Sequence, residues 1–231
     1  MPEEKEFNSE ESLQLITSMI NKVKSSYHDS GTGALLWGSA VSISAFITYL
    51  EVEYDFYIGF DIWLIVLAAI IPQIVISVRE NKRKQFKSHD DLALDAIWIT
   101  YAITIFGLIA YQNIVPGATQ DLNKQEGWSL IKHYLDKSHP DEAIAPFPLS
   151  ITSIFILIYA FPTLITGIIK KFRPMIVGAI ITYALFVASC FTSFKYDMIF
   201  SGIAALVCWF IPGLILRKRY LQLAKQKEQN V

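Results

Sequence analysis

The sequence predicts an all-α fold: a polytopic membrane helix bundle of six transmembrane helices, arranged as three hairpin repeats and preceded by an amphipathic helix. Three observations support this prediction. Six long apolar runs contain no Lys or Arg, prolines recur near the ends of the even-numbered runs, and the N-terminal tail carries apolar side chains at helical spacing.

The composition favours a membrane protein. Of the 231 residues, 53% are hydrophobic and 18% are charged, whereas soluble domains carry about 25% charged residues. About twenty apolar residues in a helix cross the hydrocarbon layer, and the runs lack the alternation of barrel strands. The six predicted spans are Ala34–Leu50, Ile62–Val78, Ala96–Tyr111, Leu149–Ile169, Met175–Phe194 and Met198–Leu216.

The apolar runs divide the chain into three parts. Residues 1–33 form a tail, 34–216 form the membrane domain with an outer insertion at 113–148, and 217–231 form a basic tail. Sixteen of the twenty Lys and Arg residues fall on the side that holds both tails, and positive charge marks the cytoplasmic side. We therefore expect a multi-pass protein of a bacterial-type plasma (inner) membrane, with both termini in the cytoplasm. Within the insertion, Trp128–Leu135 predicts a short interfacial helix.

Prolines and glycines suggest an internal repeat. Pro72, Pro162 and Pro212 each lie near the end of an even-numbered span and precede a basic cluster, and the same spacing separates Gly38 from Pro72 and Gly178 from Pro212. Equal spacing favours a two-helix repeat. Because proline weakens the helix one turn earlier, the three kinks are either packing features, which we favour, or hinges. The candidate hinge or packing residues are Gly38, Pro72, Gln73, Pro162, Gly178 and Pro212.

The N-terminal tail predicts an amphipathic helix over residues 8–28. Its apolar residues are spaced alternately by three and four positions, which is typical of a helix that packs against another helix. The helix either docks onto the protein's own bundle, pairs with a helix of a partner or a second copy, or lies on lipid. The candidate contact residues are Leu13, Ile16, Ile20, Val23 and Tyr27.

Few residues in the apolar runs have ionisable or reactive side chains. Asp95 begins the third span as a possible buried acid, although a solvated carboxylate at a helix N-terminus is favoured, and Gln73 is expected to make an interhelical hydrogen bond. Cys190 and Cys208 fall within spans and are expected to be packed thiols. Ion-coupled carriers need buried acids, which the runs lack. No nucleophile elbow, phosphate-binding loop or dinucleotide fingerprint is present, so we expect no enzyme, no cofactor, no metal and no nucleic acid.

One stretch resembles a known group. Tyr27–Gly38, with the pattern Gly-x-Gly-x-Leu-Leu-Trp-Gly from Gly31 to Gly38, resembles the entry to the first span in small bacterial six-span membrane proteins of unknown function. The resemblance lies mainly within residues 27–50, and it implies a membrane location and no catalytic or binding residue.

Two functions follow as hypotheses. The first is a non-catalytic bundle in the lipid bilayer that acts through homo-oligomerisation or through a membrane or cytoplasmic protein partner. The second is a small permease or channel for a neutral or amphiphilic solute, which predicts a polar path lined by hydroxyl groups and Gln73.

Overall fold

A computed structural model describes residues 13, 30–83, 89–144 and 151–229. This part of the chain is helical apart from one two-stranded hairpin, which confirms the all-α class. The elements are α2 (Thr32–Tyr54), α3 (Leu64–Ala68), α4 (Ile70–Arg83), α5 (His89–Gln125), β1 (Ile131–Lys132), β2 (Glu142–Ala143), α6 (Ile151–Ile169), α7 (Arg173–Ser189), α8 (Phe194–Ala205), the π-helical turn η1 (Leu206–Phe210) and α9 (Ile211–Gln229).

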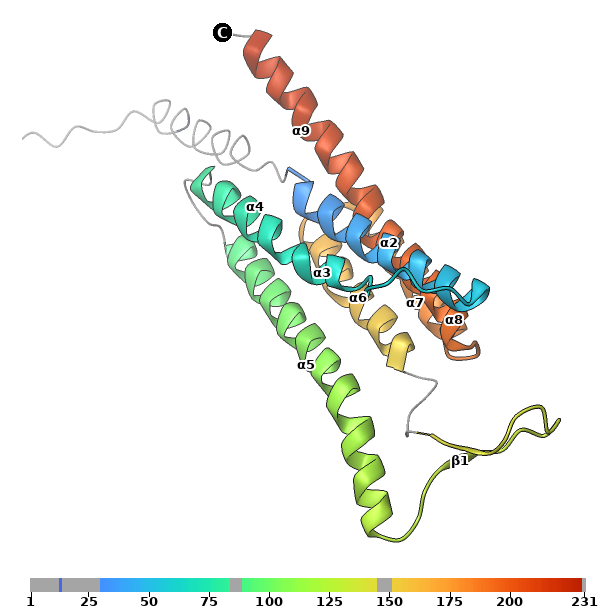
Figure 1. Ribbon diagram of the computed structural model, residues 1–231. Coiled ribbons are helices and arrows are strands. Elements are labelled where there is room, and N and C mark those ends of the chain that lie inside the picture. Colours follow the sequence, from blue (N-terminus) through green and yellow to red (C-terminus); the bar gives the residue numbers. More distant parts are fainter. Residues whose placement is uncertain (1–12, 14–29, 84–88, 145–150, 230–231) are drawn as a thin grey trace, which may run out of the picture.

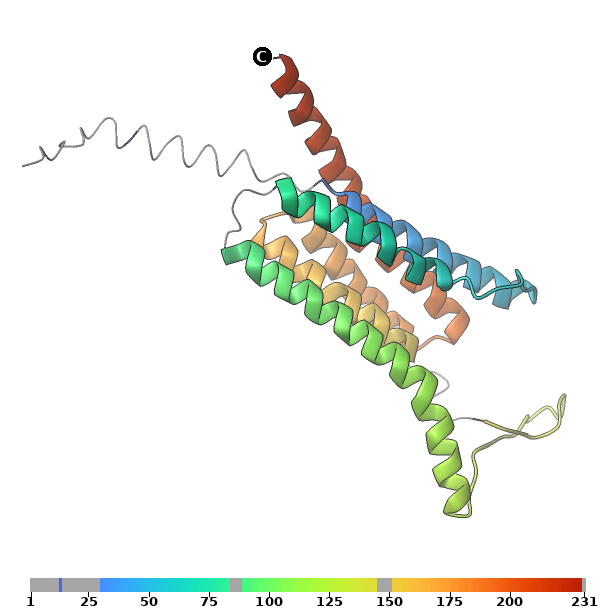
Figure 2. The ribbon, with the colours of Figure 1, turned by 60° about the vertical axis from the view of Figure 1, so that its left-hand side comes forward.

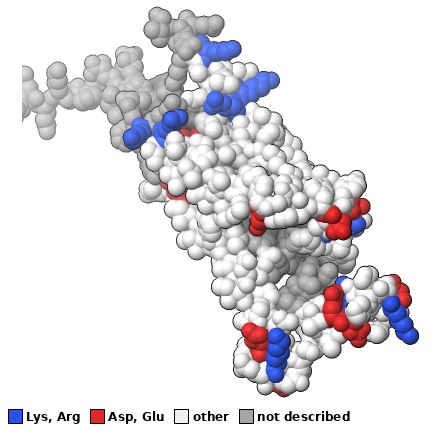
Figure 3. All heavy atoms as spheres, in the orientation of Figure 1, with Lys and Arg blue, Asp and Glu red and all other residues white. Residues whose placement is uncertain are grey.

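Several helices are long and apolar enough to cross a membrane. By length and composition these are Thr32–Tyr54, Leu64–Lys82, His89–Gln125, Thr152–Ile169 and Phe194–Gln226, and the shorter apolar helix α7 has 17 residues. Large apolar side chains lie exposed on every one of these helices. In the view of Figure 3, a surface almost free of charge separates a basic end from an opposite end that carries acidic and basic side chains.

Four helical segments form the centre of the bundle. Helix α2 packs against α8, η1 and α9, while α6 packs against α7 and α8, and α7 also contacts η1. Among the described residues, the close backbone contacts of α3 and α4 are with α2 and with each other, and those of α5 are with α6. Helix α9 projects beyond the bundle at the basic end, and the last part of α5 projects at the opposite end with the hairpin (Figures 1 and 2).

The core combines aromatic and small side chains. Tyr159 of α6 and Trp209 of η1 lie with ring centroids 4.9 Å apart. Tyr101 of α5 meets Trp209 edge-on at 6.1 Å, an arrangement that aromatic pairs prefer. The buried cluster consists of Val41, Ile156, Tyr159, Ala204, Ala205, Cys208 and Trp209.

A break between α3 and α4 coincides with the first of the three prolines. Pro72 has no N–H and crowds the carbonyl four residues earlier, which belongs to Ala68. Helix α3 ends at Ala68 and α4 begins at Ile70. The regular helix of the second apolar run is therefore interrupted at a single residue, Ala69.

The outer insertion differs from the prediction. The third apolar helix does not end at Tyr111; α5 continues to Gln125 with Pro116 inside it. The short helix predicted for Trp128–Leu135 is wrong, because this stretch contains β1, whose residues Ile131 and Lys132 pair antiparallel with Ala143 and Glu142.

Candidate functional site along a buried polar seam

Polar side chains line the contacts among α6, α7 and α8. They recur at helical spacing; on α6, for example, Ser153 and Thr163 share a buried face with Ile156 and Ala160. Small and hydroxylated side chains let membrane helices approach closely and hydrogen-bond across the contact. We call this set the polar seam; its members are Ser153, Thr163, Thr166, Thr182, Ser189, Asp197, Ser201 and Cys208.

Two indole groups donate hydrogen bonds to threonines of α6. Trp209 Nε1 donates to Thr163 Oγ1 at 3.0 Å, and Trp98 Nε1 of α5 donates to Thr166 Oγ1 at 3.2 Å. Thr163 donates its own hydroxyl hydrogen to the Tyr159 carbonyl at 3.0 Å. Each buried indole N–H therefore has a partner, and α6 is joined to both η1 and α5.

A third bond joins η1 to α7. Thr182 Oγ1 lies 3.1 Å from Cys208 Sγ and donates to the Gly178 carbonyl at 2.9 Å. Because the threonine has a single hydroxyl hydrogen, the Cys208 thiol is the donor toward Thr182. Cys208 is thus a packed thiol as expected, whereas Cys190 lies exposed just after α7, which corrects its predicted packing; both cysteines are free.

The two predicted glycines contact the same turn. A Cβ atom on Gly38 of α2 would lie 2.5 Å from Phe210 N, and one on Gly178 of α7 would lie 2.1 Å from Val207 O. Both neighbours belong to η1, which ends two residues before Pro212. A π-helical turn is often found at functional sites, and here the proline that lacks an N–H follows it within two residues.

The three predicted prolines occupy different environments. Pro162 and Pro212 are fully buried, whereas Pro72 is exposed. Pro162 lies inside α6, where Thr166 Oγ1 donates to the Pro162 carbonyl at 2.7 Å. The three prolines therefore do not occupy equivalent environments.

Gln73 faces the start of α2 without bonding across to it. Its Nε2 donates to Ser77 Oγ at 3.1 Å on its own helix. Its Oε1 is buried without a hydrogen-bond partner and would lie 3.1 Å from a Cβ on Gly33. The contact is interhelical, but the hydrogen bond is not, which corrects the expected bond.

The acidic residues that are buried differ from Asp95, the one that the sequence suggested. Asp95 is half-buried, whereas Asp91 is 5% exposed and Asp197 is 0% exposed. The sixth span was predicted to begin at Met198, but α8 begins at Phe194 and places Asp197 inside the helix. The spacing of Asp197, Ser201 and Cys208 with intervening alanines was the signal that could have revealed it.

Among the described residues, only one of the two carboxylate oxygens of Asp197 has a hydrogen-bond partner. Thr192 Oγ1 donates to Asp197 Oδ1 at 2.7 Å, while Asp197 Oδ2 is buried without a partner. The one basic side chain in the first turn of α8, Lys195, is paired with Glu53 of α2 at 2.7 Å. The expectation that the apolar helices lack a buried acid is therefore wrong.

Most of the predicted N-terminal contact residues lie outside the described residues. Leu13 is helical and 67% exposed. Ile16, Ile20, Val23 and Tyr27 are not among the described residues, so the amphipathic helix stays a prediction.

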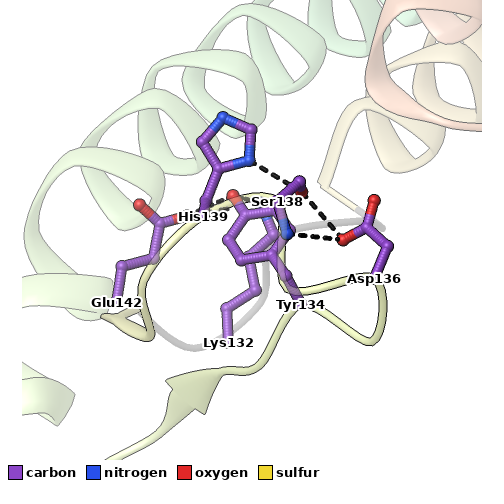
Figure 4. Close-up of polar contacts among 6 residues, drawn as sticks. All are labelled: Lys132, Tyr134, Asp136, Ser138, His139 and Glu142. Atoms are coloured by element: carbon purple, nitrogen blue, oxygen red, sulfur yellow. Dashed lines mark hydrogen bonds and ion pairs between the residues drawn. The ribbon is translucent and has the colours of Figure 1, made fainter.

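The outer hairpin carries a second polar cluster (Figure 4). Tyr134 donates to Glu142 at 2.8 Å, and Lys132 lies 3.3 Å from the same oxygen. The hydrogen bond from Tyr134 and then the one from Lys132 lower the pKa of Glu142. Hydrogen bonds from the Ser138 side chain and backbone lower the pKa of Asp136. The exposed cluster holds the hairpin together.

Neither region gathers an evident metal site. Among the described residues, no group of three or more His, Cys, Asp or Glu side chains is placed to hold a metal ion. His133 instead pairs with Asp141 at 2.7 Å, and His139 lies 2.9 Å from Ser138 Oγ.

Comparison with known proteins adds no assignment, since no family model, no curated protein and no solved structure matches the chain. The polar seam holds most of the buried polar side chains of α6, α7 and α8. It offers hydroxyl oxygens, one thiol and one carboxylate oxygen without a partner, a set suited to binding rather than to nucleophilic catalysis, which requires a base beside the nucleophile.

Proposed function

We propose that this chain is a six-span protein of a bacterial-type plasma membrane that acts without catalysis, through contacts with a second copy or with a partner membrane protein. The six spans are α2, the α3–α4 pair, α5, α6, α7 and the continuous α8–η1–α9 segment. Support for the location comes from the length and apolar composition of these helices and from the uncharged surface between the two ends.

The charge distribution supports an orientation with both termini in the cytoplasm. Basic side chains lie in the last part of α4, directly after α6 and within α9, at one end of the bundle: Arg79, Lys82, Lys170, Lys171, Arg217, Lys218 and Arg219. The opposite end carries Glu51, Glu53, Asp55 and Asp61. Basic residues near span ends remain on the cytoplasmic side.

One observation carries the proposal of assembly. Among the described residues, each of the two peripheral units, α3–α4 and α5, makes close backbone contacts with a single helix of the central bundle, and only 6% of the apolar window of each is buried. Ile71 of α4 is 70% exposed and Ile103 of α5 is 67% exposed. Membrane helices associate through close packing, so a helix whose apolar side chains are mostly exposed has a face available for another protein.

Cysteine cross-linking in native membranes tests this proposal. In a Cys190→Ser background, Ile71→Cys or Ile103→Cys is expected to give a disulfide-linked product of higher mass. Ile180→Cys, on α7 and 58% exposed, is the matched control and should remain unlinked. Equal linking at all three positions, or none at any, would contradict assembly through α4 and α5.

The N-terminal tail is tested separately. Purification in mild detergent compares the mass of the full chain with that of a chain lacking residues 1–30. A larger assembly or a stoichiometric partner that is lost on truncation supports helix pairing by Leu13 and its neighbours. A bare monomer for both chains argues against the tail as the contact.

A second candidate, a small permease for a neutral or amphiphilic solute, is favoured by one feature. The polar seam runs through α6, α7 and α8, and its middle is a π-helical turn followed by Pro212. Hydroxyl groups suit an uncharged solute, and such a turn is a place where a helix bends. Uptake of a solute into vesicles that hold the purified protein, lost on Thr182→Val, would support this function over assembly.

A further inference from the structure

We infer that Asp197 and Ser153 are ligands of one hard monovalent cation, bound where α6, α7 and α8 meet at the end opposite the basic end. Two buried oxygens without partners point to it. Among the described residues, Asp197 Oδ2 and Ser153 Oγ have no hydrogen-bond partner, although the two residues are only 0% and 3% exposed. A buried polar group without a partner is costly, and a buried charge more so.

The two oxygens lie at the same depth in the bundle. The hydrogen bond between Trp209 and Thr163 fixes the register of the parallel segments α6 and α8–η1. With a rise of 1.5 Å per residue, Ser153 lies about 15 Å from this bond along α6, and Asp197 lies about 18 Å from it along α8. Helices α6 and α8 contact each other and both residues are buried, which fits one site shared by the two side chains.

Further oxygen atoms are present at this level. Thr192 Oγ1 already touches the Asp197 carboxylate, and Ser189 Oγ donates its hydrogen to the Phe186 carbonyl at 2.7 Å. Both hydroxyls keep lone pairs for an ion. Hard cations are bound by carboxylate, hydroxyl and carbonyl oxygens, and these are the groups that this end of the seam supplies.

The net charge of the site selects a monovalent ion. Asp197 contributes one negative charge, while Lys195 in the first turn of α8 and Glu53 near the end of α2 neutralise each other at 2.7 Å. One carboxylate balances a single positive charge in a region of low dielectric constant. Calcium sites, in contrast, gather several carboxylates.

Geometry favours a cation over a proton. A protonated Oδ2 needs an acceptor at about 2.5–3.0 Å, and Asp197 Oδ2 has none. Oxygens that surround a hard cation at about 2.3–2.6 Å stand more than about 3.2 Å from one another, as octahedral geometry requires. Two buried oxygens at a similar depth that have no hydrogen-bond partner among the described residues fit a shared ion. This site is independent of the proposed helix contacts, because it lies inside the bundle.

Binding is tested on the purified full chain in detergent. Equilibrium dialysis with radioactive sodium measures stoichiometry, and thermal unfolding compares sodium, lithium and potassium chloride with choline chloride at equal ionic strength. We expect saturable binding of one ion per chain and a rise in melting temperature with at least one of the small cations but not with choline. Equal melting temperatures in all four salts, with no retained sodium, potassium or lithium, would overturn the site.

Paired variants separate the site from general stability. Asp197→Asn should abolish the cation-dependent shift, and Ser153→Ala should weaken binding at least tenfold. The controls are Asp91→Asn, a buried acid on α5, and Ser44→Ala, whose hydroxyl donates to the Ile62 carbonyl at 3.3 Å; both should respond to the cation as the parent does. If Asp197→Asn does not fold, retained sodium in the parent together with its loss in Ser153→Ala decides the question, and unchanged binding in Ser153→Ala rejects the shared site.

Discussion

The indole of Trp209 donates a hydrogen bond of 3.0 Å to Thr163, and this bond joins two helices that each carry a fully buried proline. Thr163 directly follows Pro162, and Trp209 lies three residues before Pro212. Helix α6 and the π-helical turn η1 are therefore joined where both depart from regular helical hydrogen bonding.

Thr163→Val tests this bond. Valine keeps the shape of threonine but leaves the buried indole N–H without an acceptor, which costs about 1–3 kcal/mol. The free energy of unfolding of the purified protein, measured by denaturant titration in mixed micelles, should fall by that amount. Thr104→Val is the control, since Thr104 is exposed on α5 and bonds only its own helix at 2.8 Å. Equal loss in both variants would contradict the role of the bond.

The close approach at η1 predicts a strict size limit at Gly178. A methyl group there would overlap the Val207 carbonyl, and overpacking a tight contact costs about 1–3 kcal/mol. Gly178→Ala should lower the melting temperature, and Gly38→Ala should do so as well. Gly107→Ala has nothing within 4 Å of its new methyl group and should melt at or above the parent temperature. An unchanged melting temperature in Gly178→Ala would rule out the contact.

The exposed Pro72 should matter less to stability than Pro212. Pro72→Ala restores an N–H that can bond the Ala68 carbonyl and join α3 to α4, and exposed substitutions usually change stability by about 0.5 kcal/mol or less. We expect slower amide exchange around Ala68 in this variant and a nearly unchanged melting temperature. Pro212→Ala alters a fully buried side chain and should lower the melting temperature clearly. The reverse order would contradict the assigned environments.

The outer hairpin should be stable over a defined range of pH. Hydrogen bonds lower the pKa of Glu142 and Asp136, so their contribution is present above the unfolded pKa values of about 4 and is lost as pH falls through the lower folded values. Hydrogen bonds to Tyr134 and Glu142 raise the pKa of Lys132, so its contribution is lost only as pH rises through a folded value above about 10.4.

Hydrogen exchange measures this dependence. The Ile144 amide donates to the Leu130 carbonyl at 3.0 Å, and its protection factor reports hairpin closure. Protection should be highest between roughly pH 5 and 10 and should fall on either side. Glu142→Gln should show a weaker acid transition. Protection that stays constant from neutral to strongly acidic pH would show that these carboxylates do not hold the hairpin.

The apolar runs predicted the helical segments because a long stretch without charge has few other folded states available. Glycine spacing identified Gly38 and Gly178, since only a residue without a side chain permits such close contacts. Other features depend on tertiary contacts. The burial of Asp197 follows from a helix start four residues earlier than Met198, and the π-helical turn depends on neighbours from α2 and α7. The part of α5 beyond Tyr111 carries no distinct apolar pattern. The prediction from the apolar run therefore ended this helix too early.

Labelling of single cysteines in intact cells tests the central claim most directly. In a Cys190→Ser background, Leu135→Cys places a thiol on the hairpin, where Leu135 is 94% exposed, and Lys82→Cys places one at the basic end. A membrane-impermeant maleimide should label Leu135→Cys in intact cells and Lys82→Cys only after permeabilisation. Labelling of both from the same side, or recovery of the protein in the soluble fraction, would contradict a bundle that spans the membrane with its basic end in the cytoplasm.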